Sequence, residues 1–215
     1  MRPMSAPPKT ELKATAEEEA AIRDAVRAAD PATLGPGRAI ARAEHVEGLL
    51  DLLSDPSVSD PIYDLPRPFT AASVGKWIAD CEAQRRRGEG ILFVTLDRDG
   101  TIAGYSKVTV WPERSSAELG GALRADRQNS GSGGAGAFMT FGWIFDTFGV
   151  RLMCLTAALD NVRSARLIDK AGFRRMGERD SVRLDGTIRR SIYWEFDRED
   201  WYAMVARLRA ASSTN

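Results

Sequence analysis

The chain has 215 residues, a length that suits one folded domain with an extension. Its 30 basic residues balance 30 acidic residues, so no net charge attracts nucleic acid or an anionic membrane surface. The single histidine, His45, excludes a histidine-rich metal site and a histidine-based catalytic triad. No apolar run approaches the ~20 residues of a membrane span, and the proline-rich start lacks a signal-peptide core. We therefore expect a cytoplasmic protein with no metal, no nucleic acid and no membrane as partner.

Residues 1–36 are expected to form an N-terminal extension. Thr15 and Glu18 have the spacing of a capping box, which predicts a helix of about four turns. The apolar face of this helix is thin and consists chiefly of Ile22 and Val26. We expect a solvated helix that lies across the domain or is held by a partner chain, and a homodimer is therefore left open.

Residues 37–211 are expected to form the folded domain. A short strand near residue 40 and a helix with one apolar face precede a proline-stiffened loop, residues 60–68. Thr70 then caps a second helix, in which residues at helical spacing face inward: Val74, Trp77, Ile78 and Cys81. Cys154 lies in an apolar strand, so both cysteines are expected to be buried free thiols.

Alternating apolar residues and turn signals predict six further strands. They lie at about residues 91–96, 101–111, 117–123, 151–159, 174–184 and 187–196. A strand-helix-strand crossover makes the third and fourth of these parallel, whereas hairpins make most other pairs antiparallel. The predicted fold is a mixed α/β sheet. A last helix after Asp197 is expected to turn Trp201, Val205 and Leu208 inward.

The segment from Gln128 to Gly136 is rich in glycine and serine and lies between two apolar strands. It has few side chains that could pack, but its bare backbone N–H groups can approach a ligand closely. Phenylalanines at three- and four-residue spacing give the next helix an apolar stripe: Phe138, Phe141, Phe145 and Phe148. The N-terminus of a buried helix favours negative charge, because it has unpaired N–H groups and the positive end of the helix dipole. The segment therefore predicts a phosphate site.

Two other interpretations of the glycine segment are disfavoured. Gly131, Gly133 and Gly136 have the spacing of the dinucleotide fingerprint, and Asp160 lies near the distance of its ribose-binding acid. A polar connector precedes these glycines instead of a strand, however, and too little chain follows for a second half of a doubly wound sheet. A flexible linker does not fit either, because the segment lies in mid-domain between apolar strands.

Several motifs in the chain's second half resemble one family. Gln128-x-x-Gly131-x-Gly133 is similar to the pyrophosphate loop of the GNAT family of acyl-CoA-dependent N-acetyltransferases. The downstream residues Asn161, Ser164, Arg166, Leu167, Gly172 and Phe173 resemble that family's Asn-x-x-Ser-x-Arg-Leu helix and closing Gly-Phe. The resemblance covers roughly residues 38–196 and looks closest to the ribosomal-protein N-terminal acetyltransferases. It implies a mostly antiparallel seven-stranded sheet with helices on both faces, whose central parallel pair splays apart for CoA.

The resemblance implies direct transfer of an acetyl group from acetyl-CoA to a primary amine, with CoA as product. The amine belongs to a protein N-terminus or to a small molecule. The residues expected to hold the cofactor are Leu123, Gln128, Asn129, Ser130, Gly131, Ser132, Gly133, Gly134, Asn161 and Arg166. Whether Gly133 or Gly136 opens the helix is left open, and Gly120-Gly121 suits either a bulge or close ligand approach. The alternative function is an acyl-CoA-binding module without turnover.

Five further residues are candidates for catalysis or acceptor binding. Glu118 is the one carboxylate on the strand leading to the cofactor, which makes it the candidate base. The alternative is that Glu118 is an ordinary solvent-facing residue and that water carries the proton. Ser164 is the candidate hydrogen-bond donor to the leaving thiolate. Tyr63, Asp64 and Arg67 lie in the loop that overhangs the acceptor site in the family, although a packed surface loop is equally open.

Overall fold

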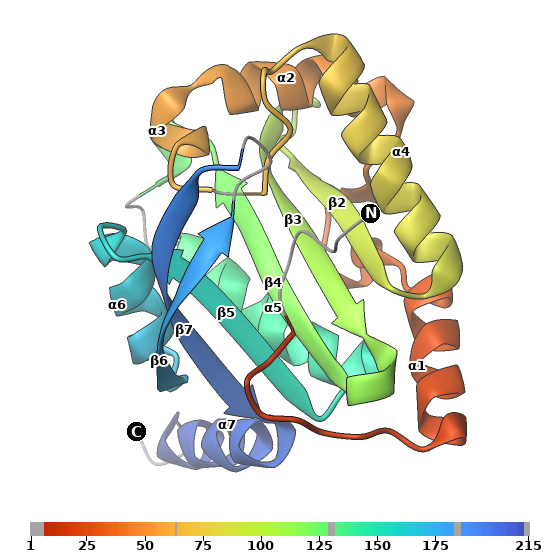
Figure 1. Cartoon of the computed structure of the whole chain (residues 1–215), viewed down its shortest axis with the longest axis vertical. Helices are drawn as coiled ribbons and strands as arrows, with labels where there is room; N and C mark the ends of the chain where they lie inside the picture. Colours follow the sequence, from red (N-terminus) through yellow and green to blue (C-terminus); the bar gives the residue numbers. More distant parts are fainter. Residues whose placement is uncertain (1–6, 63, 129–131, 183–185, 213–215) are drawn as a thin grey trace.

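The structure is a computed structural model, and it describes residues 7–62, 64–128, 132–182 and 186–212. These residues form a seven-stranded sheet in the order β1-β2-β3-β4-β5-β7-β6 (Figure 1). The strands are β1 Arg38–Ile40, β2 Gly90–Leu96, β3 Ile102–Trp111, β4 Ser116–Leu123, β5 Leu152–Ala158, β6 Arg174–Val182 and β7 Ile188–Asp197. Neighbouring strands are antiparallel except for the parallel pair β4 and β5, which confirms the predicted fold class.

Helices cover both faces of the sheet, with α2 and α4 on one face and α5 on the other (Figure 1). The helices are α1 Ala16–Ala28, α2 Val46–Ser54, α3 Pro56–Ser59, α4 Ala71–Arg87, α5 Ser132–Phe148, α6 Val162–Lys170 and α7 Arg198–Ser212. The predicted start of α4 is confirmed, because the Thr70 side chain accepts a hydrogen bond from the N–H of Ser73. At the other end of the helix, Gly88 has a φ of 73°. That left-handed conformation favours glycine and ends the helix.

The sheet separates two hydrophobic cores of unequal size. In the larger core, α5 packs its aromatic residues against the rear of β2 to β5, with Phe141, Phe145 and Phe148 all buried. In the smaller core, Trp77 of α4 meets the ring of Tyr105 edge to face, with centroids 5.4 Å apart. Because the side chains of a strand alternate between faces, β3 contributes to both cores.

The last helix differs from expectation at one residue. Trp201 is 3% exposed and Val205 packs against the larger core, but Leu208 is 52% exposed. Figure 1 shows α7 crossing the end of the sheet and finishing beyond it, so its last turns have no strand to cover. The prediction that Leu208 points inward was therefore wrong. Helical spacing predicts which face of α7 is apolar, but it does not predict how long the surface is that α7 packs against.

Helix α1 lies across the domain, and its inner face is packed. The Thr15 hydroxyl caps the helix by accepting a hydrogen bond from the N–H of Glu18 at 3.2 Å, as predicted. Ile22 and Val26 are 2% and 0% exposed and belong to the larger core. The other residues of α1 are exposed or half-buried, so the helix is solvated on its outer face and lies across the domain on two apolar side chains, as expected.

Residues 7–15 form a strap across the face of the sheet opposite α5, seen as the red segment in front of the strands in Figure 1. Thr10 donates two hydrogen bonds to the carboxylate of Glu195, from its N–H at 3.0 Å and from its hydroxyl at 2.5 Å. Glu195 has no exposed surface, so water cannot reach its carboxylate, and the strap supplies the hydrogen-bond donors instead. Lys9 adds a hydrogen bond from its ammonium to the carbonyl of Met176 at 2.6 Å.

Replacement of Thr10 by valine tests how much the strap stabilises the fold. The valine removes one donor from a buried carboxylate, so we expect the free energy of unfolding to fall by about 1.5–3 kcal/mol. Thr95→Val, at a half-buried position of β2, is the control and should change stability by less than about 0.5 kcal/mol. Urea unfolding measures both variants. Equal stability of the two would show that the Glu195 contact contributes nothing.

Candidate active site

Strands β4 and β5 part in the middle of the sheet. Their parallel pairing covers only three registers, the last of which joins Glu118 to Cys154. Beyond this register β4 stays paired with β3 as far as Leu123, while β5 stays paired with β7 as far as Ala158. The sheet is therefore split from Glu118 onward, as expected for the splayed central pair.

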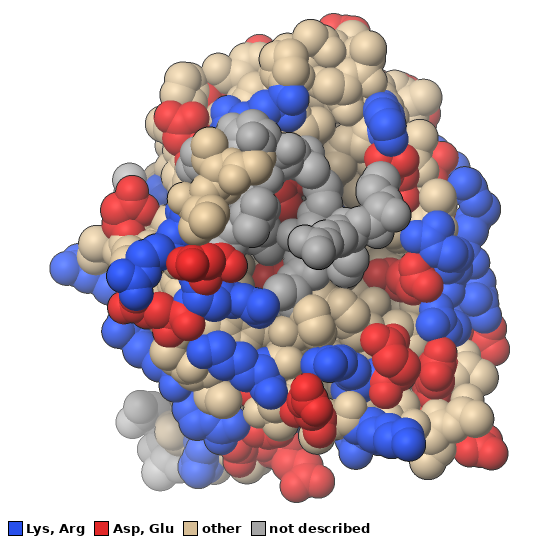
Figure 2. Space-filling view, viewed as in Figure 1, with Lys and Arg blue, Asp and Glu red and all other residues tan. Residues whose placement is uncertain are grey.

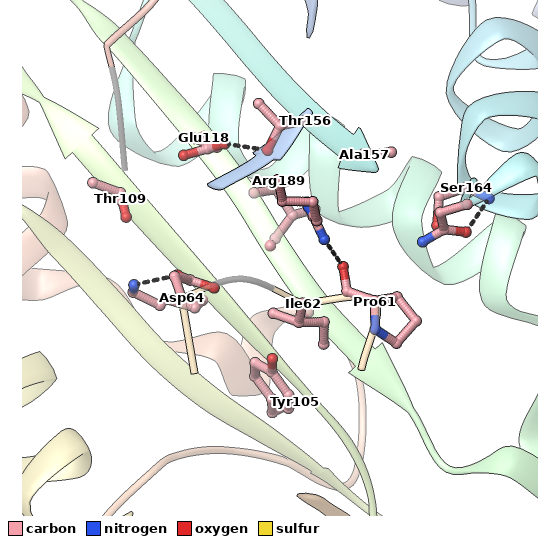
Figure 3. A pocket seen from close by; sticks show the side chains of 15 residues that line it. Pro61, Ile62, Asp64, Tyr105, Thr109, Glu118, Thr156, Ala157, Ser164 and Arg189 are labelled. Carbon is pink, nitrogen blue, oxygen red and sulfur yellow. Dashed lines mark hydrogen bonds and ion pairs between the residues drawn. The ribbon is translucent and has the colours of Figure 1, made fainter. Parts of the chain in front are cut away.

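A cavity of about 100 Å³ opens at the split (Figure 3). It is lined by residues of β3, β4, β5 and β7, by the loop after α3 and by the first turn of α6. Those residues are Pro61, Ile62, Asp64, Tyr105, Lys107, Thr109, Glu118, Leu119, Gly120, Gly121, Thr156, Ala157, Asn161, Ser164 and Arg189. Three predicted residues from distant parts of the chain, Glu118, Ser164 and Asp64, are thus brought to one cavity.

Glu118 is buried in this cavity, with 6% of its surface exposed. Its Oε1 accepts a hydrogen bond from the hydroxyl of Thr156 at 3.0 Å, and Figure 3 shows the two side chains meeting from adjacent strands. The alternative of an ordinary solvent-facing residue is therefore wrong. A buried carboxylate beside a split strand is placed where it can accept a proton from a group in the cavity.

Asp64 reaches the cavity as one half of an ion pair with Lys107. The Lys107 Nζ lies 2.7 Å from the Asp64 Oδ2, and the two side chains are 7% and 17% exposed. Burial lowers the pKa of Lys107, but the nearby charges, chiefly that of Asp64, outweigh it, so this pKa lies above its ordinary value. Lys107 consequently stays protonated, and it holds Asp64 at the lining of the cavity.

Arg67, another predicted acceptor residue, is not brought to the cavity by any described contact. The Arg67 guanidinium donates to the carbonyl of Ser59 at 2.9 Å and lies over the ring of Phe69, with 4.8 Å to its centroid. It is not among the residues that line the cavity. Tyr63 lies outside the described residues.

Gln128 joins the end of β4 to α6. Its Nε2 donates to the carbonyl of Leu123 at 2.8 Å, and its Oε1 accepts a hydrogen bond from Arg163. The predicted residues Asn129, Ser130 and Gly131 lie outside the described residues. The first residue of the predicted phosphate segment, Gln128, is therefore held between Leu123 and Arg163, and Arg163 is a partner that the sequence analysis missed.

The glycine segment is shorter than expected, because α5 already begins at Ser132. Gly133 and Gly134 lie in its first turn, so neither Gly133 nor Gly136 opens the helix. Glycine lowers helix propensity, but the later turns of α5 are held in the larger core, and this packing extends the helix toward its start. The N-terminus of α5 thus lies earlier in the chain than either predicted start.

Asn161 begins α6 and also lines the cavity. Its Oδ1 accepts a hydrogen bond from the N–H of Ser164 at 3.1 Å, which confirms it as the helix N-cap. Ser164 lines the cavity one turn further on. Arg166 is exposed on α6 and is not among the lining residues.

The backbone of β4 is bare on the side of the split. Gly120 and Gly121 are exposed, and the register between β3 and β4 runs without a shift past both. The interpretation of Gly120-Gly121 as a bulge is therefore wrong, and the interpretation that remains is close approach of a ligand to this backbone. A Cβ on Gly121 would lie 2.5 Å from the carbonyl oxygen of Tyr105, so a larger residue does not fit there. An extended ligand arm can lie along this edge.

Sequence reasoning missed several lining residues, among them Lys107, Thr109, Thr156 and Arg189. One signal was present, since Lys107 and Thr109 alternate with apolar residues in β3 and share a face with buried Tyr105. A lysine inside such a strand is rarely buried without a partner. Nothing near Thr156 or Arg189 in the sequence marks them as neighbours of Glu118 or Pro61.

Both cysteines are buried and free, as predicted. Burial raises the pKa of Cys81 to about 12, and burial raises that of Cys154 well above its ordinary value. Because the thiolate is the reactive form, we expect Ellman's reagent at pH 8 to label neither thiol in the folded protein and both in denaturant. Rapid labelling of the native protein would contradict this placement.

Within the described ranges, no group of three or more histidine, cysteine, aspartate or glutamate residues is placed to hold a metal ion. Over the same part of the chain, no helix combines the length and the apolar character that crossing a membrane requires.

A family model described as the acetyltransferase (GNAT) domain matches residues 38–174. No curated protein sequence matches the chain significantly.

Similar solved structures include the ribosomal-protein-S5-alanine acetyltransferase from Vibrio fischeri. It is 15% identical with a TM-score of 0.65, and the match covers 76% of this chain and 93% of that chain. RimJ of Mycobacterium smegmatis, in complex with CoA-disulfide, is 18% identical with a TM-score of 0.65, covering 80% and 88%. RimL, a ribosomal L7/L12 α-N-protein acetyltransferase in complex with coenzyme A, is 16% identical with a TM-score of 0.66, covering 76% and 96%. At these identities the likeness shows the fold.

Proposed function

The chain belongs to the acetyltransferase (GNAT) domain family, and from this premise we propose that it moves an acetyl group from acetyl-CoA to a primary amine by direct attack. The observation that carries the proposal is the buried carboxylate of Glu118 at the point where β4 and β5 part. Proton acceptance by a positioned carboxylate is what an amine acceptor requires, because only the neutral amine can attack.

The residues beside the split fit acetyl-CoA, the acyl donor of this family. The exposed backbone at Gly120 and Gly121 offers hydrogen-bonding groups to the pantetheine arm without side chains in the way. The N-terminus of α5, from Ser132, offers N–H groups and the helix dipole to the phosphates. Asn161, already the cap of α6, faces the same cavity and would hold the arm from the other side. Bound acetyl-CoA supplies the thioester whose C–S bond breaks as the C–N bond forms.

Two side chains of the cavity, Glu118 and Ser164, would act on the amine and on the leaving sulfur, respectively. Glu118 takes the proton that the attacking amine loses, directly or through one water, and the Thr156 hydroxyl orients its carboxylate from 3.0 Å. Ser164 lines the cavity at the start of α6 and would donate a hydrogen bond to the leaving sulfur. Serine is a weak acid, so we assign it this hydrogen bond and leave full protonation of the thiolate to solvent.

We propose an α-amine of a protein as the acceptor, with a small-molecule amine as the alternative. The support is that the similar structures include acetyltransferases of ribosomal proteins.

Calorimetry and a CoA-release assay test the proposal together. We expect acetyl-CoA to bind, and CoA to appear when peptides with a free α-amine are added. Polyamines, amino acids and aminoglycosides complete the amine panel. Binding without release for any amine would favour the acyl-CoA-binding module. No binding at millimolar acetyl-CoA would overturn the proposal.

A further inference from the structure

The loop after α3 forms one wall of the cavity, through Pro61, Ile62 and Asp64. We call these three residues the loop wall. We infer that two cations, Lys107 from β3 and Arg189 from β7, fasten the loop wall across the split and so determine which acceptors fit. Lys107 and Arg189 are positioning residues in this inference. Its statement about acceptors rests on the proposed function.

The first fastening is the buried ion pair. Lys107 stands on β3, directly beside β4, and holds the Asp64 carboxylate at 2.7 Å. A lysine that is 6% exposed needs a partner, because an isolated buried ammonium is costly. The position of Asp64 is thereby fixed relative to the strand that runs beside Glu118.

The second fastening comes from the other side of the split. Arg189 stands near the start of β7, two residues before Ser191, which is the end of the register with β5. Its guanidinium donates a hydrogen bond to the carbonyl of Pro61. The same guanidinium lies 3.3 Å from the hydroxyl of Ser191 on its own strand. Figure 3 shows Arg189 reaching Pro61, with Ile62 and Tyr105 on the far side of the contact.

The Lys107–Asp64 and Arg189–Pro61 contacts start from opposite sides of the split. Lys107 and Arg189 lie on β3 and β7, the strands that flank the parted pair β4 and β5. The loop wall is therefore tied to both halves of the sheet, and it spans the region where an acceptor meets Glu118. A wall held at both ends leaves a cavity of fixed size, which selects acceptors by their bulk.

Four variants and one rescue test the inference. Lys107→Met and Arg189→Met each remove one fastening. Their matched controls are Lys76→Met, whose exposed lysine pairs with Asp80 at 2.7 Å, and Arg190→Met, whose exposed arginine pairs with Glu178 at 2.6 Å. Arg189→Lys keeps a donor for Pro61 and serves as the rescue.

Amide hydrogen exchange on the free protein gives the first readout. The N–H of Ile62 donates to the carbonyl of Ser59 at 3.0 Å, so a peptide that carries Ile62 reports on the wall. In both fastening variants we expect this peptide to exchange about tenfold faster than in the unmodified protein. In the controls we expect its exchange rate to be unchanged. Arg189 is only half-buried, so its variant keeps the test valid even if Lys107→Met fails to fold.

Steady-state kinetics gives the second readout. We expect the KM for the acceptor to rise about tenfold, with the KM for acetyl-CoA within about twofold and bulky amines gaining relative to small ones. Arg189→Lys should recover most of the acceptor KM. Exchange and acceptor KM equal to those of the controls would overturn the inference while leaving the proposed function standing. A wild-type protein that binds no acetyl-CoA would instead remove the proposed function, and exchange alone would then decide the fastening.

Discussion

Glu118→Gln is expected to lower kcat for acetyl transfer by about 10²–10⁴-fold, with the affinity for acetyl-CoA unchanged within about twofold. Glutamine has the shape of glutamate, and its carbonyl can still accept the hydrogen bond of Thr156. It cannot take a proton from the amine, however, so only the chemical step should suffer. Single-turnover measurements of CoA release, together with calorimetry of acetyl-CoA binding, separate the two effects.

Two further variants sharpen this result. Glu113→Gln makes the same change at an exposed residue next to β4 and should leave kcat unaltered. Thr156→Val removes the hydroxyl that orients the carboxylate and should cost about tenfold, less than loss of the carboxylate itself. A full rate for Glu118→Gln would mean that the amine binds neutral or loses its proton to water. The catalytic assignment of Glu118 would then be withdrawn.

Local patterns were sufficient to predict most of the fold. The caps at Thr15 and Thr70 were readable because each satisfies backbone N–H groups within its own turn. The alternation of apolar residues gave the strands, and the crossover through α5 gave the one parallel pair. The inward face of α4, including Cys81, followed from helical spacing alone. These features depend on neighbours a few residues away, and sequence order contains that information.

The cavity depends on contacts between distant segments, and the sequence analysis therefore found only part of it. Thr156 meets Glu118 38 residues away, and Lys107 meets Asp64 43 residues away. No periodicity relates such pairs, because the sheet topology alone brings them together. The burial of Glu118 could be established only once β3, β4 and β5 were placed side by side.

Phe141→Ala is expected to lower the free energy of unfolding by about 3–5 kcal/mol. Phe141 is 2% exposed in the larger core, where its ring lies 5.0 Å from the centroid of Phe173 and 6.1 Å from that of Trp201. Alanine leaves a cavity among these rings that the sheet on one side and α7 on the other cannot close. Guanidinium unfolding followed by tryptophan fluorescence measures the loss.

Met139→Ala is the control on the same helix, because Met139 is 53% exposed and should change stability by less than about 0.5 kcal/mol. Equal effects at the two positions would mean that α5 is not packed by its aromatic stripe. The stripe also bears on the proposed function, since it packs α5 into the larger core and the N-terminus of α5 is the proposed phosphate site. We therefore expect Phe141→Ala to weaken acetyl-CoA binding under conditions where the variant is still folded, whereas a purely local cavity would leave the affinity unchanged.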